Sequence, residues 1–206
     1  MKIKVKDIPI YYLNPDHYQE KRERMEQFLP TLGMKYERVD NTCDIPPLTR
    51  KMNEGLLRVL ERGMYENVYP FLVAEDDIEL ITKLPEEINI PEEAVLIYWG
   101  ISKYECGGLK PSLCIEEYDE EYFRVKHSLA THAILVPSKE SAMFYYDVIV
   151  RAINKIDFAD IYLAIESGKQ LFLTPKDGPY FCQIDGHTRP VTDFLWKDVL
   201  DKYLIE

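Results

Sequence analysis

The sequence predicts a single α/β domain in which a mostly parallel central sheet is flanked by helices. Short apolar runs alternate along the chain with segments whose apolar residues recur at the helical period. This alternation is typical of strand–helix–strand units, which pair their strands in parallel and cover the sheet with helices. With 206 residues the chain is long enough to bury a core of its own, and we interpret residues 1–206 as one domain.

Composition and charge exclude several classes of partner. Hydrophobic residues make up 46% of the chain and aromatic residues 12%, which argues against disorder. The 25 Lys and Arg residues face 36 Asp and Glu residues, so the formal net charge is −11. Nonspecific nucleic-acid binding needs a field of basic side chains, and an anionic membrane surface repels an acidic protein. We therefore expect neither partner, although a local basic cleft is compatible with this balance.

Neither a signal peptide nor a membrane span is expected. The first residues, 1–7, alternate lysine with single apolar residues and lack a continuous apolar stretch. The apolar runs 94–99 and 133–137 are far shorter than the roughly 20 residues that cross a bilayer. The cysteines have neither zinc-site nor disulfide-framework spacing: Cys43, Cys106, Cys114 and Cys182. We therefore expect a cytoplasmic protein with reduced thiols.

The expected elements follow one another in a regular order. Apolar runs predict strands over residues 8–13, 34–39, 69–74, 94–99, 131–136 and 170–173. Helical periodicity predicts helices over residues 17–32, 49–62, 138–154, 157–167 and 192–203, with Gly33, Gly63 and Gly168 ending three of them. We expect a short helix and turn over 83–93, a loop or small hairpin over 100–126, and a loop over 174–190.

Polar residues follow three of the predicted strands. Asn14 and Asp40 each come directly after a strand, and a third strand runs straight into Glu75, Asp76 and Asp77, which we call the acidic turn. Ligands of α/β sheets bind beyond the carboxyl ends of the strands. The sequence therefore predicts a ligand site at this edge.

The acidic turn itself suggests a metal. Three adjacent carboxylates repel one another unless water or a cation disperses their charge. Mg²⁺ and Mn²⁺ prefer oxygen donors and are commonly held by one or two carboxylates plus substrate phosphates. The alternative is a solvated turn in which an aspartate caps a helix.

Segments spread over roughly residues 8–190 resemble glycosyltransferase family 25, the group of lipooligosaccharide and collagen galactosyltransferases. In order, they are residues 10–14 with Arg22 and Arg24, 36–40, 69–80, 94–100, 131–136 and 160–163. The resemblance implies a GT-A-like, Rossmann-like fold for nucleotide sugars, with the acidic turn as its DxD motif. Residues 50–55 depart from the family, because they contain neither its usual Ser nor its usual His.

The resemblance also implies an activity. The protein would move a sugar from a nucleoside-diphosphate sugar, with a UDP-sugar favoured, to a hydroxyl group of a glycan or glycoconjugate. Mn²⁺ or Mg²⁺ would stabilise the diphosphate leaving group. Transfer with inversion of the anomeric carbon requires a carboxylate that accepts the proton of the acceptor hydroxyl.

Roles for individual residues follow from the resemblance and from their chemistry. The expected metal ligands are Asp77, Glu75 and His187. The expected contacts to the donor are Asn14, Arg22, Asp40, Asn53, Glu75, Asp76 and Arg189, of which the arginines suit phosphate oxygens. Asp160 is the expected catalytic base, with Asp157 as the second choice, and Trp99 and His132 are the expected acceptor contacts. The structural alternatives are helix caps for the two aspartates, a solvated surface for Arg22 and His187, and core positions for Trp99 and His132.

Two other functions stay open at this point. A nucleotide-sugar or carbohydrate-binding module could use the same fold without catalysis, since the family Ser and His are absent. A nucleotidyltransferase also uses carboxylates at strand ends, but residues 14–16 are not a Gly-rich phosphate loop. The net charge disfavours a glycosyltransferase that modifies DNA.

Overall fold

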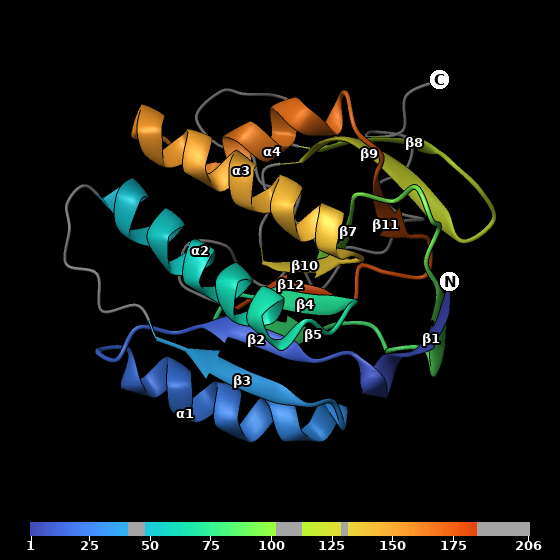
Figure 1. Ribbon diagram of the computed structural model, residues 1–206. Helices are drawn as coiled ribbons and strands as arrows, with labels where there is room; N and C mark the ends of the chain where they lie inside the picture. Colours follow the sequence, from blue (N-terminus) through green and yellow to red (C-terminus); the bar gives the residue numbers. More distant parts are fainter. Residues whose placement is uncertain (41–47, 102–112, 129–131, 185–206) are drawn as a thin grey trace.

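A computed structural model describes residues 1–40, 48–101, 113–128 and 132–184 and has a central sheet with helices on both faces (Figure 1). The helices are α1 (Gln19–Phe28), α2 (Leu48–Glu66), α3 (Lys139–Lys155) and α4 (Ala159–Ser167), with 3-10 turns at η1 (Val5–Asp7) and η2 (Leu29–Leu32). The strands are β1 (Lys2–Lys4), β2 (Ile10–Leu13), β3 (Tyr36–Val39), β4 (Phe71–Ala74), β5 (Ile78–Leu80), β6 (Glu87–Asn89), β7 (Leu96–Gly100), β8 (Leu113–Glu117), β9 (Tyr122–Ser128), β10 (Ala133–Val136), β11 (Phe172–Pro175) and β12 (Phe181–Gln183). The α/β class is confirmed. The helix expected over residues 192–203 lies outside the described residues.

The large sheet is mixed, which corrects the prediction of a mostly parallel sheet. Its order is β3-β2-β4-β10-β7-β11-β9-β8, and β12 pairs with both β5 and β7. β2 is parallel to β3 and β4, and β7 is parallel to β11 and β12, whereas β10 is antiparallel to both of its neighbours. In the chain, α1 lies between β2 and β3 and α2 lies between β3 and β4, as crossovers between parallel strands require.

Of three further expectations, two differ from the structure and one is confirmed. The helix predicted within residues 83–93 is wrong, because this segment contains β6, which pairs antiparallel with β1. The region 100–126 contains the β8–β9 hairpin, the second of the two alternatives for it. The loop expected over 174–190 contains β12. β1, β5, β6 and β12 are only three residues long, too short for alternation of apolar residues to stand out in the sequence.

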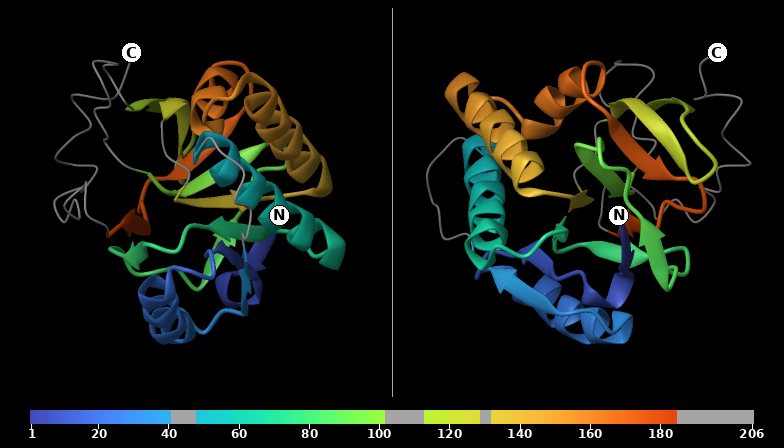
Figure 2. Two further views of the ribbon diagram at one scale, coloured as in Figure 1. Left: turned by 90° about the vertical axis from the view of Figure 1, so that its left-hand side faces the viewer. Right: turned by 45° about the vertical axis from the view of Figure 1, so that its right-hand side comes forward.

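Alternate residues of the buried strands serve two cores. Helices α2, α3 and α4 cover one face of the sheet and α1 covers the other (Figure 2). Tyr11 and Phe71 pack in the core with residues of α2, α3 and α4, while Tyr12 and Leu72 pack in the core with Met25 of α1. Strands buried on both faces are apolar throughout. This explains why the sequence shows continuous apolar runs there instead of alternation.

The sequence predicted that Gly63 ends the helix over residues 49–62. This prediction is wrong, because Gly63 lies inside α2. A Cβ atom at this position would lie 2.6 Å from Cε2 of Phe71 in β4. The glycine therefore allows α2 to approach the sheet closely, and the helix continues to Glu66. Among the described residues, no helix is both long and apolar enough to cross a membrane.

Several chain segments bring polar side chains to one edge of the sheet. Asn14, Asp40 and Glu75 follow the carboxyl ends of β2, β3 and β4. Because β10 runs antiparallel to β4, its beginning lies at the same edge, and Ala133 pairs with Ala74. This register places His132 beside the acidic turn.

Candidate functional site

The acidic turn connects β4 with β5 at the carboxyl edge of the sheet. β4 is fully buried, and two residues of the turn are buried with it, since Asp76 is 8% and Asp77 5% exposed. Burial of a carboxylate is unfavourable unless hydrogen bonds or an opposite charge compensate for it. The partners of these two side chains therefore define the site.

Asp76 is held by groups from β2 and α1. Asn14 Nδ2 donates to Asp76 Oδ2 at 2.7 Å, and Lys21 Nζ lies 3.4 Å from Asp76 Oδ1. Arg24 Nη2 donates to the backbone carbonyl of Asp76 at 3.0 Å. Burial raises the pKa of Asp76 above the usual carboxyl value, although Asn14 and Lys21 both favour the ionised form. The protein compensates the charge of this carboxylate only in part.

Asp77 has one engaged and one unpaired carboxylate oxygen. Its Oδ2 accepts from Lys21 Nζ at 3.0 Å and from Gln183 Nε2 at 3.1 Å, and its backbone carbonyl accepts from Ile184 N at 2.7 Å. Oδ1 is buried and has no hydrogen-bond partner among the residues that the structure describes. A buried oxygen in this state is the atom that a bound cation would engage.

Lys21 is the residue that the sequence interpretation missed. It lies in the first turn of α1, and its ammonium group contacts both buried aspartates. The signal was present, because Lys21 precedes the buried Met25 by four residues and Leu29 by eight, which places all three on one face of the helix. Gln183 carried no such signal, since β12 is only three residues long.

Arg22, the expected donor contact on this helix, is engaged elsewhere. Its Nε donates to Glu26 Oε1 at 2.7 Å, an i,i+4 ion pair with both side chains more than 40% exposed. Arg24 instead binds the carbonyl of Asp76. The structure thus brings Lys21 and Arg24 to the acidic turn.

Glu75 is paired with His132, the expected acceptor contact. His132 Nδ1 lies 3.1 Å from Glu75 Oε2, and the backbone N–H of Glu75 donates to the carbonyl of His132 at 2.9 Å. Burial disfavours the imidazolium form of His132, but the hydrogen bond and charge of Glu75 outweigh it, so the pKa of His132 is raised. Glu75 was expected to bind a metal or the donor, and its carboxylate here binds the imidazole.

The two expected catalytic aspartates lie on either side of the start of α4, Asp157 before the helix and Asp160 in its first turn. Asp157 Oδ1 accepts from Phe158 N at 2.8 Å, and Asp160 Oδ1 accepts from Ile161 N at 2.9 Å. Burial raises the pKa of Asp160, and the negative charge of Glu75 raises it further. The effect of Glu75 couples Asp160 electrostatically to the acidic turn.

Asn53, expected to contact the donor, holds the backbone before α4. Its Nδ2 donates to the carbonyl of Asp157 at 2.6 Å, and its Oδ1 accepts from Ala159 N at 3.1 Å. Both functional groups of this buried amide are therefore used within the protein. The contact fixes the loop that presents Asp160.

Trp99, expected at the acceptor, lies in the core with no exposed surface. Its ring makes an edge contact with Tyr180 at 5.4 Å between centroids and stacks on Phe181 at 6.5 Å. Tyr98, next in sequence, and Tyr145 belong to the other core, and burial raises the pKa of both phenols. Neither phenol oxygen has a partner within the described part of the chain.

Asp40 lies on the far side of Asn14, at the end of β3. Its Oδ1 accepts from Asp16 N at 3.2 Å, and Arg38 joins the same group by donating to the carbonyl of Asn14 at 3.0 Å. These contacts order the turn that follows β2. The remaining two expected contacts, His187 and Arg189, lie outside the described residues.

The donor set at the acidic turn fits a divalent cation that a substrate helps to hold. Within the described ranges, no three His, Cys, Asp or Glu side chains form a complete metal-binding group. Asp76 and Asp77 nevertheless converge on one cation, Lys21 Nζ, and Asp77 Oδ1 is unpaired. Mg²⁺ and Mn²⁺ need only one or two carboxylates when phosphates supply further oxygens.

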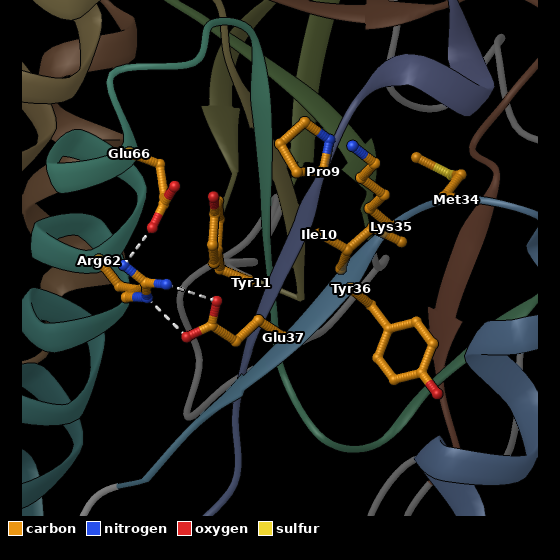
Figure 3. A pocket seen from close by; sticks show the side chains of 9 residues that line it. All are labelled: Pro9, Ile10, Tyr11, Met34, Lys35, Tyr36, Glu37, Arg62 and Glu66. Carbon is orange, nitrogen blue, oxygen red and sulfur yellow. Dashed lines mark hydrogen bonds and ion pairs between the residues drawn. The ribbon is translucent and has the colours of Figure 1, made fainter.

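A hollow lies at the ends of β2 and β3 that are opposite the acidic turn (Figure 3). Arg62 of α2 lines it and donates to Glu37 with two nitrogens, Nε to Oε1 at 2.5 Å and Nη2 to Oε2 at 2.9 Å. Glu66 also contacts Arg62 at 2.5 Å. We interpret this group as an ion-pair cluster that connects α2 with β3.

Comparisons with known proteins support the fold. No protein-family model matches the chain, and no curated protein matches its sequence. Among solved structures, the chain is similar to the crystal structure of a glycosyltransferase involved in the glycosylation of the major capsid of PBCV-1. The match has a TM-score of 0.57 and 9% sequence identity and covers 94% of this chain and 100% of that chain.

At this identity, the likeness concerns the fold alone. The chain has a glycosyltransferase-like α/β fold, and the acidic turn lies at the carboxyl edge of its sheet. Membership of family 25 stays a prediction from the sequence segments.

Proposed function

We propose that the protein is a glycosyltransferase that moves a sugar from a nucleoside-diphosphate sugar, with a UDP-sugar favoured, to a hydroxyl group of a glycan or glycoconjugate. One observation carries this proposal: on a fold shared with a glycosyltransferase, the acidic turn buries two converging carboxylates and leaves Asp77 Oδ1 unpaired. Natural proteins rarely bury such groups without a use for them.

Asp77, with Asp76 beside it, would hold Mn²⁺ or Mg²⁺. When bound there, the cation supplies positive charge that stabilises the departing diphosphate. Of the expected metal ligands, Glu75 is engaged with His132, and we assign it instead to the donor side of the site. His187 remains a proposed third ligand.

The donor would lie along the carboxyl edge of β2, β3 and β4. Asn14 is fully buried, and its Oδ1 has no partner in the described part of the chain, so this amide could accept a hydrogen bond from the donor. Asp40 ends the neighbouring strand and is the proposed contact to the ribose. Arg189 is the proposed diphosphate contact, because guanidinium groups suit phosphate oxygens.

Asp160 is the proposed catalytic base. Its pKa is raised mainly by burial, so it accepts a proton more readily than an ordinary carboxylate. In a single displacement, the acceptor oxygen would bond to the anomeric carbon while the bond to the diphosphate breaks, and the acceptor proton would pass to Asp160. Asn53 positions this group through the backbone, and Asp157, whose carboxylate accepts from the backbone N–H of Phe158 just before the helix, remains the second choice.

His132 is the proposed acceptor contact, since it lies beside Glu75 and is coupled to the charge of Asp160. Trp99 is not included, because its ring is fully buried.

Nucleotide release tests the proposal. Purified protein is incubated with Mn²⁺, a panel of UDP- and GDP-sugars and a glycan mixture, and the released nucleoside diphosphate is quantified. We expect release from one donor class, reduced about 100-fold or more in Asp160→Asn, the usual range for loss of a general base. The matched control Asp147→Asn replaces an exposed aspartate of α3 and should retain full activity.

A non-catalytic binding module is the second candidate, because residues 50–55 lack the family Ser and His and Asn53 has a structural role there. Such a module would bind a nucleotide sugar without releasing the nucleotide. Tight binding with equal, background-level release in the wild type and Asp160→Asn would favour it over the enzyme.

A further inference from the structure

Lys21 places a positive charge where the proposed function requires a divalent cation. Its ammonium nitrogen lies 3.0 Å from Asp77 Oδ2 and 3.4 Å from Asp76 Oδ1, and 5.6 Å from the centroid of the Tyr18 ring. The three charged side chains are shielded, with 25% of Lys21, 11% of Asp76 and 7% of Asp77 exposed. This geometry resembles a cation between two ligands.

The ammonium compensates one of the two negative charges. A lysine side chain is ordinarily charged throughout the physiological pH range, and two carboxylates within 3.4 Å favour its charged form. Arg24 is bound to the backbone carbonyl of Asp76 and to neither of the two carboxylates, and Asp77 Oδ1 has no hydrogen-bond partner among the described residues, so this oxygen is left for a cation.

We propose that Lys21 is an internal competitor of the divalent cation, occupying the acidic turn while the donor site is empty and yielding it when metal and nucleotide arrive together. The inference rests on the proposed function. A divalent ion beside Asp77 would repel an ammonium group held 3.0 Å from the same carboxylate. The lysine has a flexible four-carbon stem and can move, and the diphosphate of the donor offers it a new anionic partner.

This arrangement couples metal binding to nucleotide binding. Without a nucleotide, Mn²⁺ must displace Lys21 into a position with no phosphate to meet, so the metal alone binds weakly. With a nucleotide, the displaced ammonium gains a partner. Because coupling between two ligands is reciprocal, each should strengthen the binding of the other, and part of this coupling should depend on Lys21.

Calorimetric titration of Mn²⁺ alone into the nucleotide-free protein tests the inference. Lys21→Met removes the charge, and Lys21→Gln removes it while retaining an N–H that can donate to Asp77, which serves if the methionine variant does not fold. Lys21→Arg keeps the positive charge. Lys155→Met, an exposed lysine in the last turn of α3, is the matched control.

We expect Lys21→Met and Lys21→Gln to bind Mn²⁺ at least tenfold more tightly than the wild type, and Lys21→Arg and Lys155→Met to match the wild type. Unchanged or weaker binding in both neutral variants would overturn the inference, as would the absence of Mn²⁺ binding in every variant. The proposed function has a separate readout. Nucleotide release with unchanged Mn²⁺ affinities would remove only the inference, whereas absence of release from every donor would remove the function as well.

Discussion

Two clusters, each with one basic side chain between two carboxylates, lie at opposite ends of β2 and its neighbours. At one end, Arg62 binds Glu37 and Glu66 near the surface, and Glu37 receives two parallel hydrogen bonds. At the other end, Lys21 binds Asp76 and Asp77, which are buried and leave Asp77 Oδ1 unpaired. The two clusters contain the same kinds of charged groups, but they differ in how deeply the carboxylates are buried and in how completely they are paired.

The difference separates a structural ion pair from a candidate site. Exposed ion pairs are screened by water, so the Arg62 cluster has little effect on the free energy of unfolding. Buried carboxylates with incomplete compensation are unfavourable and gather at functional sites. Incomplete compensation, and not the number of charges, is therefore what marks the acidic turn.

The first prediction contrasts the two basic residues. Lys21→Met should lower the free energy of unfolding by roughly 2–3 kcal/mol, somewhat less than the loss of one partner from a fully buried ion pair, because Lys21 is 25% exposed. Arg62→Met should leave it almost unchanged. Urea unfolding of both variants measures this. Equal losses of stability would show that the two clusters are energetically equivalent and would remove the contrast.

A smaller effect is expected from pH, through the Glu75–His132 pair. The pKa of His132 is raised in the folded protein, so protonation of this histidine stabilises the fold below its unfolded pKa. That stabilisation is lost as the pH rises through the folded pKa. The free energy of unfolding of the wild type should therefore fall, relative to that of His132→Gln, as the pH rises from about 5 to 9, a span that includes the usual histidine pKa. Parallel curves for the two proteins would contradict the pairing.

The sequence predicted the acidic turn well, and the reason is local. Phe71 to Ala74 are apolar because the strand is buried on both faces, and the change to three acids is visible without any tertiary information. Asn14, which also follows a strand, was predicted at the same edge, and the structure brings it to Asp76. Parallel strands with known ends suffice for such predictions.

Other predictions depended on how a helix, a side chain or a strand is oriented, and the type of a single residue does not reveal this. Arg22 was expected at the donor because guanidinium groups suit phosphates, and Lys21 was not considered, but the rotation of α1 is set by the buried Met25 and Leu29. Asn53 has the chemistry of a ligand contact, yet its amide meets the backbone around Asp157 across 104 residues of chain. The direction of β10 was equally hidden, because an apolar run is the same in both directions.

The central claim is that the acidic turn binds a metal–nucleotide pair, and calorimetric titration of UDP in the presence of Mn²⁺ tests it most directly. Three proteins are compared: the wild type, Asp77→Asn, and Glu37→Gln, which alters one carboxylate of the opposite cluster. The account predicts Mn²⁺-dependent binding to the wild type, at least tenfold weaker binding to Asp77→Asn and unchanged binding to Glu37→Gln. Equal affinities in all three proteins, or no binding to the wild type, would contradict it.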